Sequence, residues 1–252
     1  MIAVAKSQLG YSESRTKETI YAAWASRSSL PWCSEFVAWS AYKAGIPSSI
    51  IPVGTTSGEY REFFAEQGRY YILNNGQNNS SCGCKKMSAK TISFSGIKPG
   101  DILLIESNGN YADGPDHTCM VVSKNYNTVT TIDGNSHDQV EYRIRRASQI
   151  HGVCRPLYNL TRVSLNAKAV SGKRVKLIWK KLSDVSGYQI YRSTQKNSGY
   201  RLIKTVGKST NAYTDKQIVK NKGYYYRVRA YKVCNGKRVY GRLSTIKTVK
   251  AV

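Results

Sequence analysis

The sequence predicts an α+β domain over residues 1–158, followed by an all-β sandwich of the immunoglobulin-like type over residues 159–252. Two patterns support this division. Apolar residues after Cys33 recur at the spacing of an α-helix, whereas from Pro99 onward short apolar runs alternate with turn residues, as strands do. A chain of 252 residues, 40% of them hydrophobic, is long enough to build two cores.

The clearest predicted helix begins at Cys33. Apolar and small residues then recur at positions 36, 37, 40, 41 and 44, and Gly45 followed by Pro47 forms a C-terminal stop. A shorter apolar helix is expected at Tyr21–Trp24. Residues 50–95 are rich in Gly, Asn and Ser around one helical patch, and we expect them to form a lid-like insertion.

Short strands make up the rest of the predicted structure. In the first domain they are expected at Ile102–Ile105, Thr118–Ser123, Val129–Ile132 and from Val153 onward. In the second domain they are expected at 175–179, 187–192 and 224–231. Because apolar and polar residues alternate in the first and last of these three, each is predicted to bury one face.

The positive charge is concentrated in the second domain. The whole chain has a net charge of +24, yet residues 1–160 carry 16 Lys and Arg against 13 Asp and Glu, a net of +3. Residues 161–252 carry 23 against 2, a net of +21. This module is therefore predicted to meet a polyanion, and nucleic acid, an anionic membrane and wall teichoic acids all qualify by charge alone.

Neither a membrane anchor nor a secretion signal is visible in the chain. No stretch approaches the roughly 20 consecutive apolar residues that span a bilayer. The first six residues, Met1 to Lys6, lack a basic segment followed by a long apolar one. We therefore expect either a protein that never carried a signal peptide or one trimmed to its mature form.

The six cysteines predict neither a disulfide scaffold nor a cofactor or metal site. They lie at positions 33, 82, 84, 119, 154 and 234, too few and too scattered for a scaffold of this size. Cys82 and Cys84 are separated by one residue, where zinc knuckles use two or more. We expect a surface loop there whose thiols are free or mutually oxidised.

Cys33 is the best candidate for a nucleophile. A thiol attacks a carbonyl as the thiolate, and the unpaired N–H groups of a helix N-terminus stabilise such an anion. His117 opens a predicted strand beside a turn, where substrate has access. One strand later Asp133 and Asn135 are expected to point to one side and to hold the imidazole. The alternatives are an inert buried thiol at 33 and a hairpin turn at 133–135.

In this order, four segments resemble the cysteine, histidine-dependent amidohydrolase/peptidase (CHAP) domain over nearly all of residues 1–158. They are Pro31-Trp32-Cys33-Ser34-Glu35-Phe36-Val37-Ala38-Trp39, Pro99-Gly100-Asp101-Ile102, Asp116-His117-Thr118 and Ile132-Asp133-Gly134-Asn135. The resemblance implies a papain-like α+β fold with an antiparallel sheet. It also implies cleavage of peptidoglycan, at the muramoyl–alanine amide or within the stem or cross-bridge peptide.

Site residues follow from this resemblance one by one. Cys33 becomes the nucleophile, His117 the general base and then acid, and Asp133 with Asn135 the orienting pair. The family often has Glu where this chain has Asp133, which leaves open whether Asp133 or Asn135 is the main partner of the imidazole. A backbone N–H near Cys33 is expected in the oxyanion hole.

Residues 163–252 resemble a bacterial fibronectin type III module. The residues that carry the likeness are Trp179 on an early strand, the run Gly187-Tyr188-Gln189-Ile190-Tyr191-Arg192, and the late run Tyr225-Tyr226-Arg227-Val228-Arg229-Ala230. Modules of this kind bind or act as spacers, so the resemblance implies no catalytic role for the second domain.

Weaker candidates surround the site. Trp32 and Tyr111 are predicted to bind substrate, and Trp39 fits the cleft and the core equally well. Cys119 shares a strand face with His117, but a packing role is favoured over an accessory thiol. Structural or surface roles are expected for His137 and His151, and the run Asp113 to Asp116 is too weak a calcium motif to predict a metal.

These observations predict a secreted peptidoglycan hydrolase located at the cell wall, either a phage lysin or a housekeeping enzyme. Its basic module would bind anionic wall polymers, and we expect a monomer without nucleic-acid or membrane partners. A non-catalytic wall-binding or adhesion protein with a decayed site is the main alternative. Nucleic-acid binding rests on charge alone, since no recognition helix or stacking motif is visible.

Overall fold

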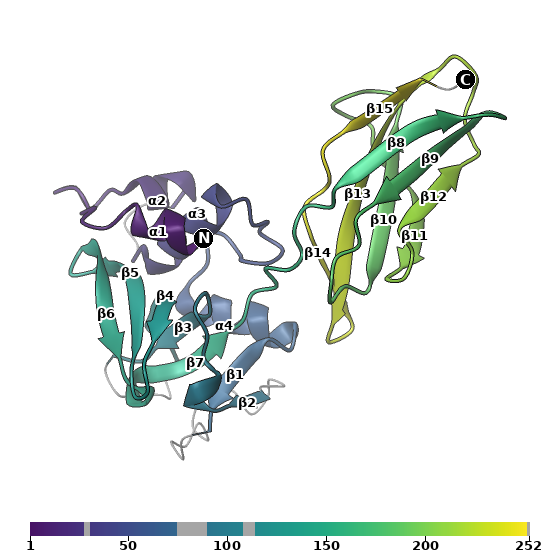
Figure 1. Ribbon diagram of the computed structural model, residues 1–252. Helices are drawn as coiled ribbons and strands as arrows, with labels where there is room; N and C mark the ends of the chain where they lie inside the picture. The colour runs from purple at the N-terminus through teal and green to yellow at the C-terminus, as the bar shows by residue number, and fades with distance from the viewer. Residues whose placement is uncertain (28–30, 75–89, 108–113, 251–252) are drawn as a thin grey trace. The chain divides into compact units, whose positions relative to one another are not determined.

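A computed structural model describes residues 1–27, 31–74, 90–107 and 114–250 (Figure 1). The chain divides into two compact units, Met1–Pro156 and Leu157–Val252, close to the boundary at residue 158 that the sequence predicts. Within the described ranges, no helix is both long and apolar enough to cross a membrane.

A seven-stranded sheet in the order β2-β1-β7-β3-β4-β5-β6 forms the base of the first unit. Its strands are β1 Tyr70–Leu73, β2 Lys90–Ile92, β3 Ile102–Ile105, β4 His117–Lys124, β5 Val129–Ser136, β6 Gln139–Arg145 and β7 Ile150–Cys154. Neighbouring strands are antiparallel, apart from the parallel pair β1–β2. The first three strands predicted in this unit are present. The strand expected from Val153 onward instead runs over Ile150–Cys154 and ends one residue after that start, and β1, β2 and β6 were not predicted.

Four α-helices accompany the sheet in the described part of this unit. They are α1 Ile2–Lys6, α2 Ile20–Trp24, α3 Cys33–Lys43 and α4 Ser57–Glu66, and two short 3₁₀ turns, η2 Phe94–Gly96 and η3 Ala147–Gln149, lie between strands. Helix α3 packs on β4 and β5 and is itself covered by α1 and α2, while α4 contacts β1 and β7 (Figure 1). The helix predicted to begin at Cys33 is therefore confirmed, and it lies over the two strands that carry His117 and Asp133.

Gly134 allows α3 to lie close to the sheet. A Cβ built at this position in β5 would lie 2.5 Å from Cβ of Phe36, the residue that α3 turns toward β5. Real Cβ atoms do not approach so closely, so any larger residue would push the helix away from the strand. The glycine thus controls the distance between the helix that carries Cys33 and the strand that carries Asp133.

The expectation of a lid-like insertion at 50–95 is wrong for the described part of that segment. Thr56 and Glu59 form a reciprocal capping box that starts α4. Tyr60 and Phe64 of this helix are fully buried, and the Ser57 hydroxyl lies 2.7 Å from that of Thr118 on β4. The apolar patch in the sequence is short, but it anchors a helix that belongs to the body of the unit.

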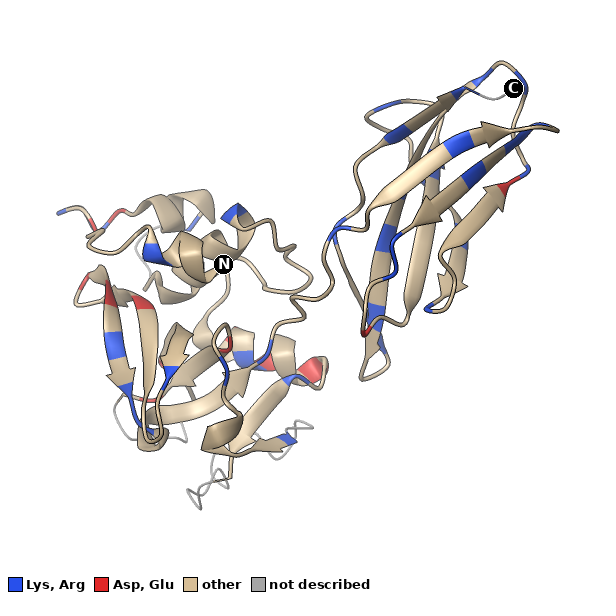
Figure 2. Cartoon of the chain, viewed as in Figure 1, with Lys and Arg blue, Asp and Glu red and all other residues tan. Residues whose placement is uncertain are grey.

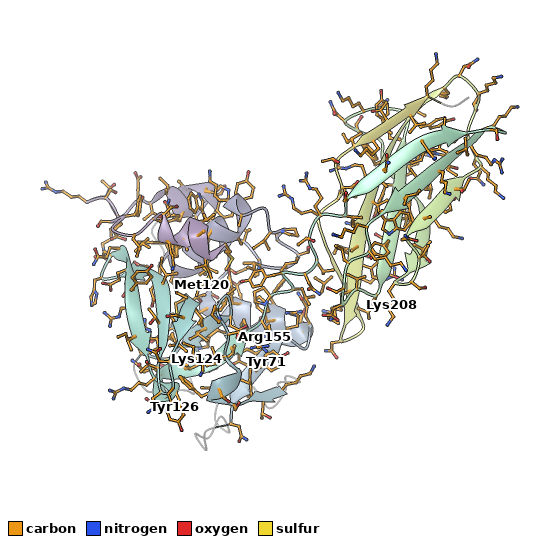
Figure 3. All side chains as sticks on the ribbon, in the orientation of Figure 1. Tyr71, Met120, Lys124, Tyr126, Arg155 and Lys208 are labelled. Carbon is orange, nitrogen blue, oxygen red and sulfur yellow. The ribbon has the colours of Figure 1, made fainter. Side chains whose placement is uncertain are left out.

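The Pro99-Gly100-Asp101 motif fixes the end of the first unit to its sheet. Gly100 has a φ of 89°, a left-handed conformation that glycine adopts without strain, and its N–H donates to the Val121 carbonyl. The buried Asp101 accepts two hydrogen bonds from Arg155, at 2.8 and 2.7 Å. The same guanidinium lies 5.4 Å from the centre of the Tyr71 ring (Figure 3).

The second unit is a sandwich of two sheets. One has the order β12-β9-β8, and the other has the order β11-β10-β13-β14, with β15 also paired to β13. The strands are β8 Leu165–Val170, β9 Arg174–Trp179, β10 Gly187–Ser193, β11 Arg201–Gly207, β12 Ala212–Asp215, β13 Gly223–Cys234, β14 Lys237–Tyr240 and β15 Lys247–Lys250. The predicted alternation in β9 is confirmed, and the sheets enclose Val175, Leu177, Trp179, Tyr188 and Tyr226. The all-β sandwich architecture predicted for this part of the chain is therefore present.

Positive charge is spread over the strands of this unit, and acidic residues are few (Figure 2). Its two carboxylates are both engaged in ion pairs, Asp184 with Lys232 and Asp215 with Arg192. Since these are the only Asp or Glu residues after position 160, most of the Lys and Arg side chains have no acidic partner within the unit.

Replacing Gly134 by alanine is expected to destabilise the first unit by about 1–3 kcal/mol, because the new methyl group overlaps the Phe36 side chain. Gly58→Ala is the matched control. A Cβ there meets nothing closer than 3.9 Å, and alanine favours a helix by at most about 1 kcal/mol. The urea midpoint, followed by tryptophan fluorescence, checks both, and equal midpoints for the two variants would contradict the packing role of Gly134.

Candidate functional site

Cys33 is the first residue of α3, and its side chain borders a cleft. The residue is 3% exposed, and Trp32 precedes it as the N-cap without a side-chain capping bond. The cleft has a volume of about 310 Å³ and is lined by Arg27, Pro31, Cys33, Ser34, Glu35, Thr55, Thr56, Ser57, Gly58, Pro115 and Asp116. The sulfur is thus placed at a helix N-terminus, where the free N–H groups favour an anion.

His117 is the first residue of β4, and the side chain of Cys33 is one of the groups that raise the pKa of its imidazole. Asp116 holds the start of this strand against β3. Its carboxylate accepts hydrogen bonds from the N–H and hydroxyl of Ser107, at 3.0 and 2.7 Å, and its own N–H donates to the Ile105 carbonyl. The imidazole therefore projects from a strand end that is held against the end of β3.

Asp133 on β5 holds the other side of the imidazole. Nε2 of His117 donates to Oδ2 of Asp133 at 2.9 Å, which leaves Nδ1 as the nitrogen available to the sulfur of Cys33. The same Oδ2 accepts a hydrogen bond from Nη2 of Arg145 on β6. Asp133 has no exposed surface, so both charged partners act on a carboxylate shielded from water.

The pKa of His117 is raised from 6.5 to about 9. Burial alone lowers it, but the hydrogen bond to Asp133 and the hydrogen bond and charge of Cys33 outweigh burial. Burial raises the pKa of the Asp133 carboxyl, yet the hydrogen bond and charge of His117 and the charge of Arg145 bring it below its usual value. The site therefore favours a protonated imidazole of His117 beside the ionised carboxylate of Asp133 at neutral pH.

Asn135 does not share the orienting role that the sequence predicts for it. Its φ is 59°, and the pairing of β5 with β6 shifts register between Asp133 and Ser136, so the alternation of side chains is interrupted. In the part of the chain that the structure describes, Asn135 makes no hydrogen bond with the imidazole, and Asp133 fills this role.

Trp32 belongs to the core, and its predicted place in a substrate site is wrong. It is 1% exposed, stacks on Tyr21 with ring centres 5.2 Å apart, and donates its indole N–H to Glu13 at 2.8 Å. A tryptophan is large and apolar enough to be drawn into the nearest aromatic cluster. Trp39 packs against Tyr21 in the same cluster. Tyr111, Asp113, Cys82 and Cys84 lie outside the described residues.

Cys119 lies behind the site, opposite Asp133 in the β4–β5 pair, and has no exposed surface. Burial, and to a lesser extent the nearby charge of Asp133, raises the pKa of the Cys119 thiol well above its usual value. A thiol that keeps its proton suits a packing role. His137 pairs with Glu141 on the surface, at 2.7 Å. His151 is buried against the Tyr70 hydroxyl, and burial lowers its pKa to about 4.

Two residues of the site were not predicted. Arg145 shares a strand face with other polar residues in the sequence, so that face looked exposed. Glu35, 2% exposed, lines the cleft two residues after Cys33 and lies 3.5 Å from Arg27. Burial raises the pKa of Glu35, although its own N–H, the Ser34 hydroxyl and Arg27 oppose this. The sequence did contain one signal for Glu35: it is a charged residue among the apolar residues of a predicted helix, and a charge in such a position is uncommon unless it has a partner.

The described residues contain no group of three or more His, Cys, Asp or Glu side chains able to hold a metal ion. The chemistry that can be derived from the site is that of Cys33, His117 and Asp133 themselves. A nucleophile, a base in contact with it and a group that orients the base form a constellation that transfers acyl groups.

No family model matches the chain, and no curated protein sequence matches it. Among solved structures it is similar to an Fn3-like protein from Clostridium thermocellum, with 27% identity over 36% of this chain and 90% of that one and a TM-score of 0.30. It is also similar to the pectate lyase PelI from Erwinia chrysanthemi, with 21% identity over 34% of this chain and 28% of the lyase and a TM-score of 0.30. A third similar structure is the fn3 domain of human contactin 1, with 15% identity over 36% of this chain and 75% of that one and a TM-score of 0.28. Fibronectin type III-like proteins are thus among the structures that this chain resembles, over about a third of its length.

Proposed function

We propose that the chain is a peptidoglycan hydrolase that cleaves an amide bond of the bacterial cell wall by cysteine–histidine catalysis. The observation that carries this proposal is that Cys33 borders a cleft and acts on the pKa of His117, whose imidazole is hydrogen-bonded to the buried Asp133. The four sequence segments that resemble a CHAP domain supply the substrate class, and a papain-like arrangement, with Cys on a helix and His on an antiparallel sheet, is part of the same proposal.

The reaction begins when the sulfur of Cys33 attacks the amide carbonyl carbon. The tetrahedral intermediate collapses as the C–N bond breaks, and the imidazolium of His117 gives its proton to the leaving amine. Water then attacks the thioester while His117 takes a proton from it. The C–S bond breaks, the carboxylic acid leaves and the thiolate is restored.

The N-terminal turn of α3 supplies donors for the oxyanion. The first N–H groups of a helix have no partner within the helix, and the N–H of Glu35 acts on its own carboxyl, whose pKa it lowers. The N–H groups of Cys33 and Ser34 are the remaining candidates nearest the sulfur. A fixed donor of this kind is worth roughly 3–4 kcal/mol in related hydrolases.

The basic second unit is proposed to keep the enzyme on the anionic wall, and the proposed site of action is therefore outside the cell. An alternative in which the site has decayed is not favoured, because Asp133, although one methylene shorter than glutamate, reaches the imidazole at 2.9 Å.

Cys33→Ala is expected to lower the rate at which purified cell walls lose turbidity by on the order of a thousandfold or more, since it removes the nucleophile. Sedimentation with those walls should be unchanged, because the second unit is intact. Cys234→Ala, which removes a thiol from the second unit, is the control and should keep full activity. Clearing of walls by Cys33→Ala at the wild-type rate would disprove the proposal.

Mass spectrometry of the fragments released from purified peptidoglycan identifies the bond. Stem peptides with a new N-terminal alanine would indicate an amidase, and cut stems or cross-bridges an endopeptidase. Intact wall material after incubation with wild-type protein would contradict hydrolysis of either kind.

The activity of the wild-type enzyme is expected to fall as pH rises through about 9, where the His117 imidazolium loses its proton. The raised pKa of His117 also means that protonation of this residue contributes to the stability of the fold. That contribution is fully present below pH 6.5 and is lost as the pH rises through about 9. Asp133→Asn removes a group that raises the pKa of His117, so the alkaline limb of kcat/KM should move to lower pH.

Asn135→Ala is the matched control for this experiment and should leave the alkaline limb in place, because Asn135 does not contact the imidazole. A shift with Asn135→Ala and none with Asp133→Asn would reverse the roles given to these two residues. Thermal unfolding of each variant separates this effect from loss of the fold.

A further inference from the structure

The second unit contains a cleft of its own at one end of the sandwich. It has a volume of about 680 Å³, within the range of ligand sites in proteins. Its walls come from β10, the following loop, the start of β11 and the segment that leads from β12 into β13. The lining residues are Arg192, Ser193, Thr194, Gln195, Gly199, Arg201, Leu202, Ile203, Gln217, Lys222 and Tyr224.

Three cations and no carboxylate line this cleft. Arg192 is held in place by its ion pair with Asp215 at 2.9 Å, by the Gln217 carbonyl and by the Tyr224 ring, 5.4 Å from its guanidinium. Both polar contacts use Nη1, which leaves Nε and Nη2 without a hydrogen bond to the described residues. Arg201 and Lys222 form no ion pair within the described part of the chain.

The rest of the lining is polar and closely fixed. The Ser193 hydroxyl donates to the Ser198 carbonyl at 2.6 Å and accepts from the Gln195 N–H at 2.9 Å, so the loop after β10 has a defined shape. The cleft therefore offers a pre-ordered guanidinium, two further cations and several amide and hydroxyl groups. This combination suits an oxyanion on a hydroxyl-rich chain.

Arginine side chains lie over several tyrosine rings of this unit and cover one side of each ring. Besides Arg192 over Tyr224, guanidinium groups lie over four other rings of the larger sheet and its edge. These are Arg227 over Tyr200, Arg229 over Tyr191 and Tyr240, and Arg238 over Tyr231, at 3.9–5.6 Å. Proteins that bind single-stranded nucleic acid stack bases on free aromatic faces, and each of these five rings has a guanidinium over it.

We propose that the cleft bordered by Arg192, Arg201 and Lys222 is a binding site for the phosphodiester groups of a sugar-alcohol phosphate polymer. Arg192 and Arg201 would each face a phosphate with a planar pair of donors, while Lys222 adds a point charge. The volume admits a repeating unit of such a chain and not only one isolated anion. The choice of a wall polymer as the source of the phosphate rests on the proposed function.

The test uses the full chain and poly(glycerol phosphate) of defined length, with binding followed by calorimetry at roughly 0.15 M salt. In Arg201→Gln/Lys222→Gln the Kd should rise by about tenfold or more. Lys176→Gln/Lys180→Gln is the matched control, since it removes two exposed cations of the same unit that do not line the cleft. Its Kd should change less than about threefold, as expected for a screened surface charge.

Equal losses in the two double variants would overturn the proposal, because binding would then depend on net charge and not on the cleft. Absence of wild-type binding to poly(glycerol phosphate), or tighter binding to single-stranded DNA of matched charge, would overturn it as well. Wall hydrolysis measured on the same preparations separates the two proposals: hydrolysis without polymer binding contradicts this site, and polymer binding without hydrolysis contradicts the proposed enzyme.

Discussion

A single buried carboxylate organises the first unit. Asp133 has no exposed surface, and a buried carboxylate is costly unless charged or strongly donating groups surround it. His117 and Arg145 fulfil this requirement from the strands on either side. Because Nε2 of the imidazole is committed to Asp133, the ring has one orientation, and in the proposed mechanism its other nitrogen exchanges a proton.

The scaffold converts this interaction into a fixed geometry. His117 and Asp133 lie on neighbouring strands of a continuous sheet, and Cys33 lies on a helix that packs directly onto those two strands. Sites that are built on strands and helices hold their side chains more exactly than sites on loops. The contact between Gly134 and Phe36 is therefore part of the proposed catalytic arrangement as well as of the core.

Residue types and spacing sufficed to predict Cys33 at a helix start, His117 at a strand start and Asp133 one strand later. Each of these lies in a local pattern with a strong signal, and the family resemblance placed them in one site. The role given to Asn135 failed because strict alternation was assumed through a segment where a bulge interrupts it. Trp32 was misplaced since sequence alone does not distinguish an aromatic that lines a cleft from one that fills a core. Arg145 and Glu35 escaped prediction because their roles depend on tertiary pairing, which leaves no local pattern.

The two units hold different parts of the proposed function. The first holds the sulfur, imidazole and carboxylate, and the second holds nearly all the excess positive charge. Catalysis as proposed depends above all on His117 being protonated at neutral pH beside Cys33. An NMR titration of the His117 imidazole tests this most directly. We predict a midpoint near 9 in the wild type that falls in Cys33→Ala, and a wild-type midpoint at or below 6.5 would contradict it.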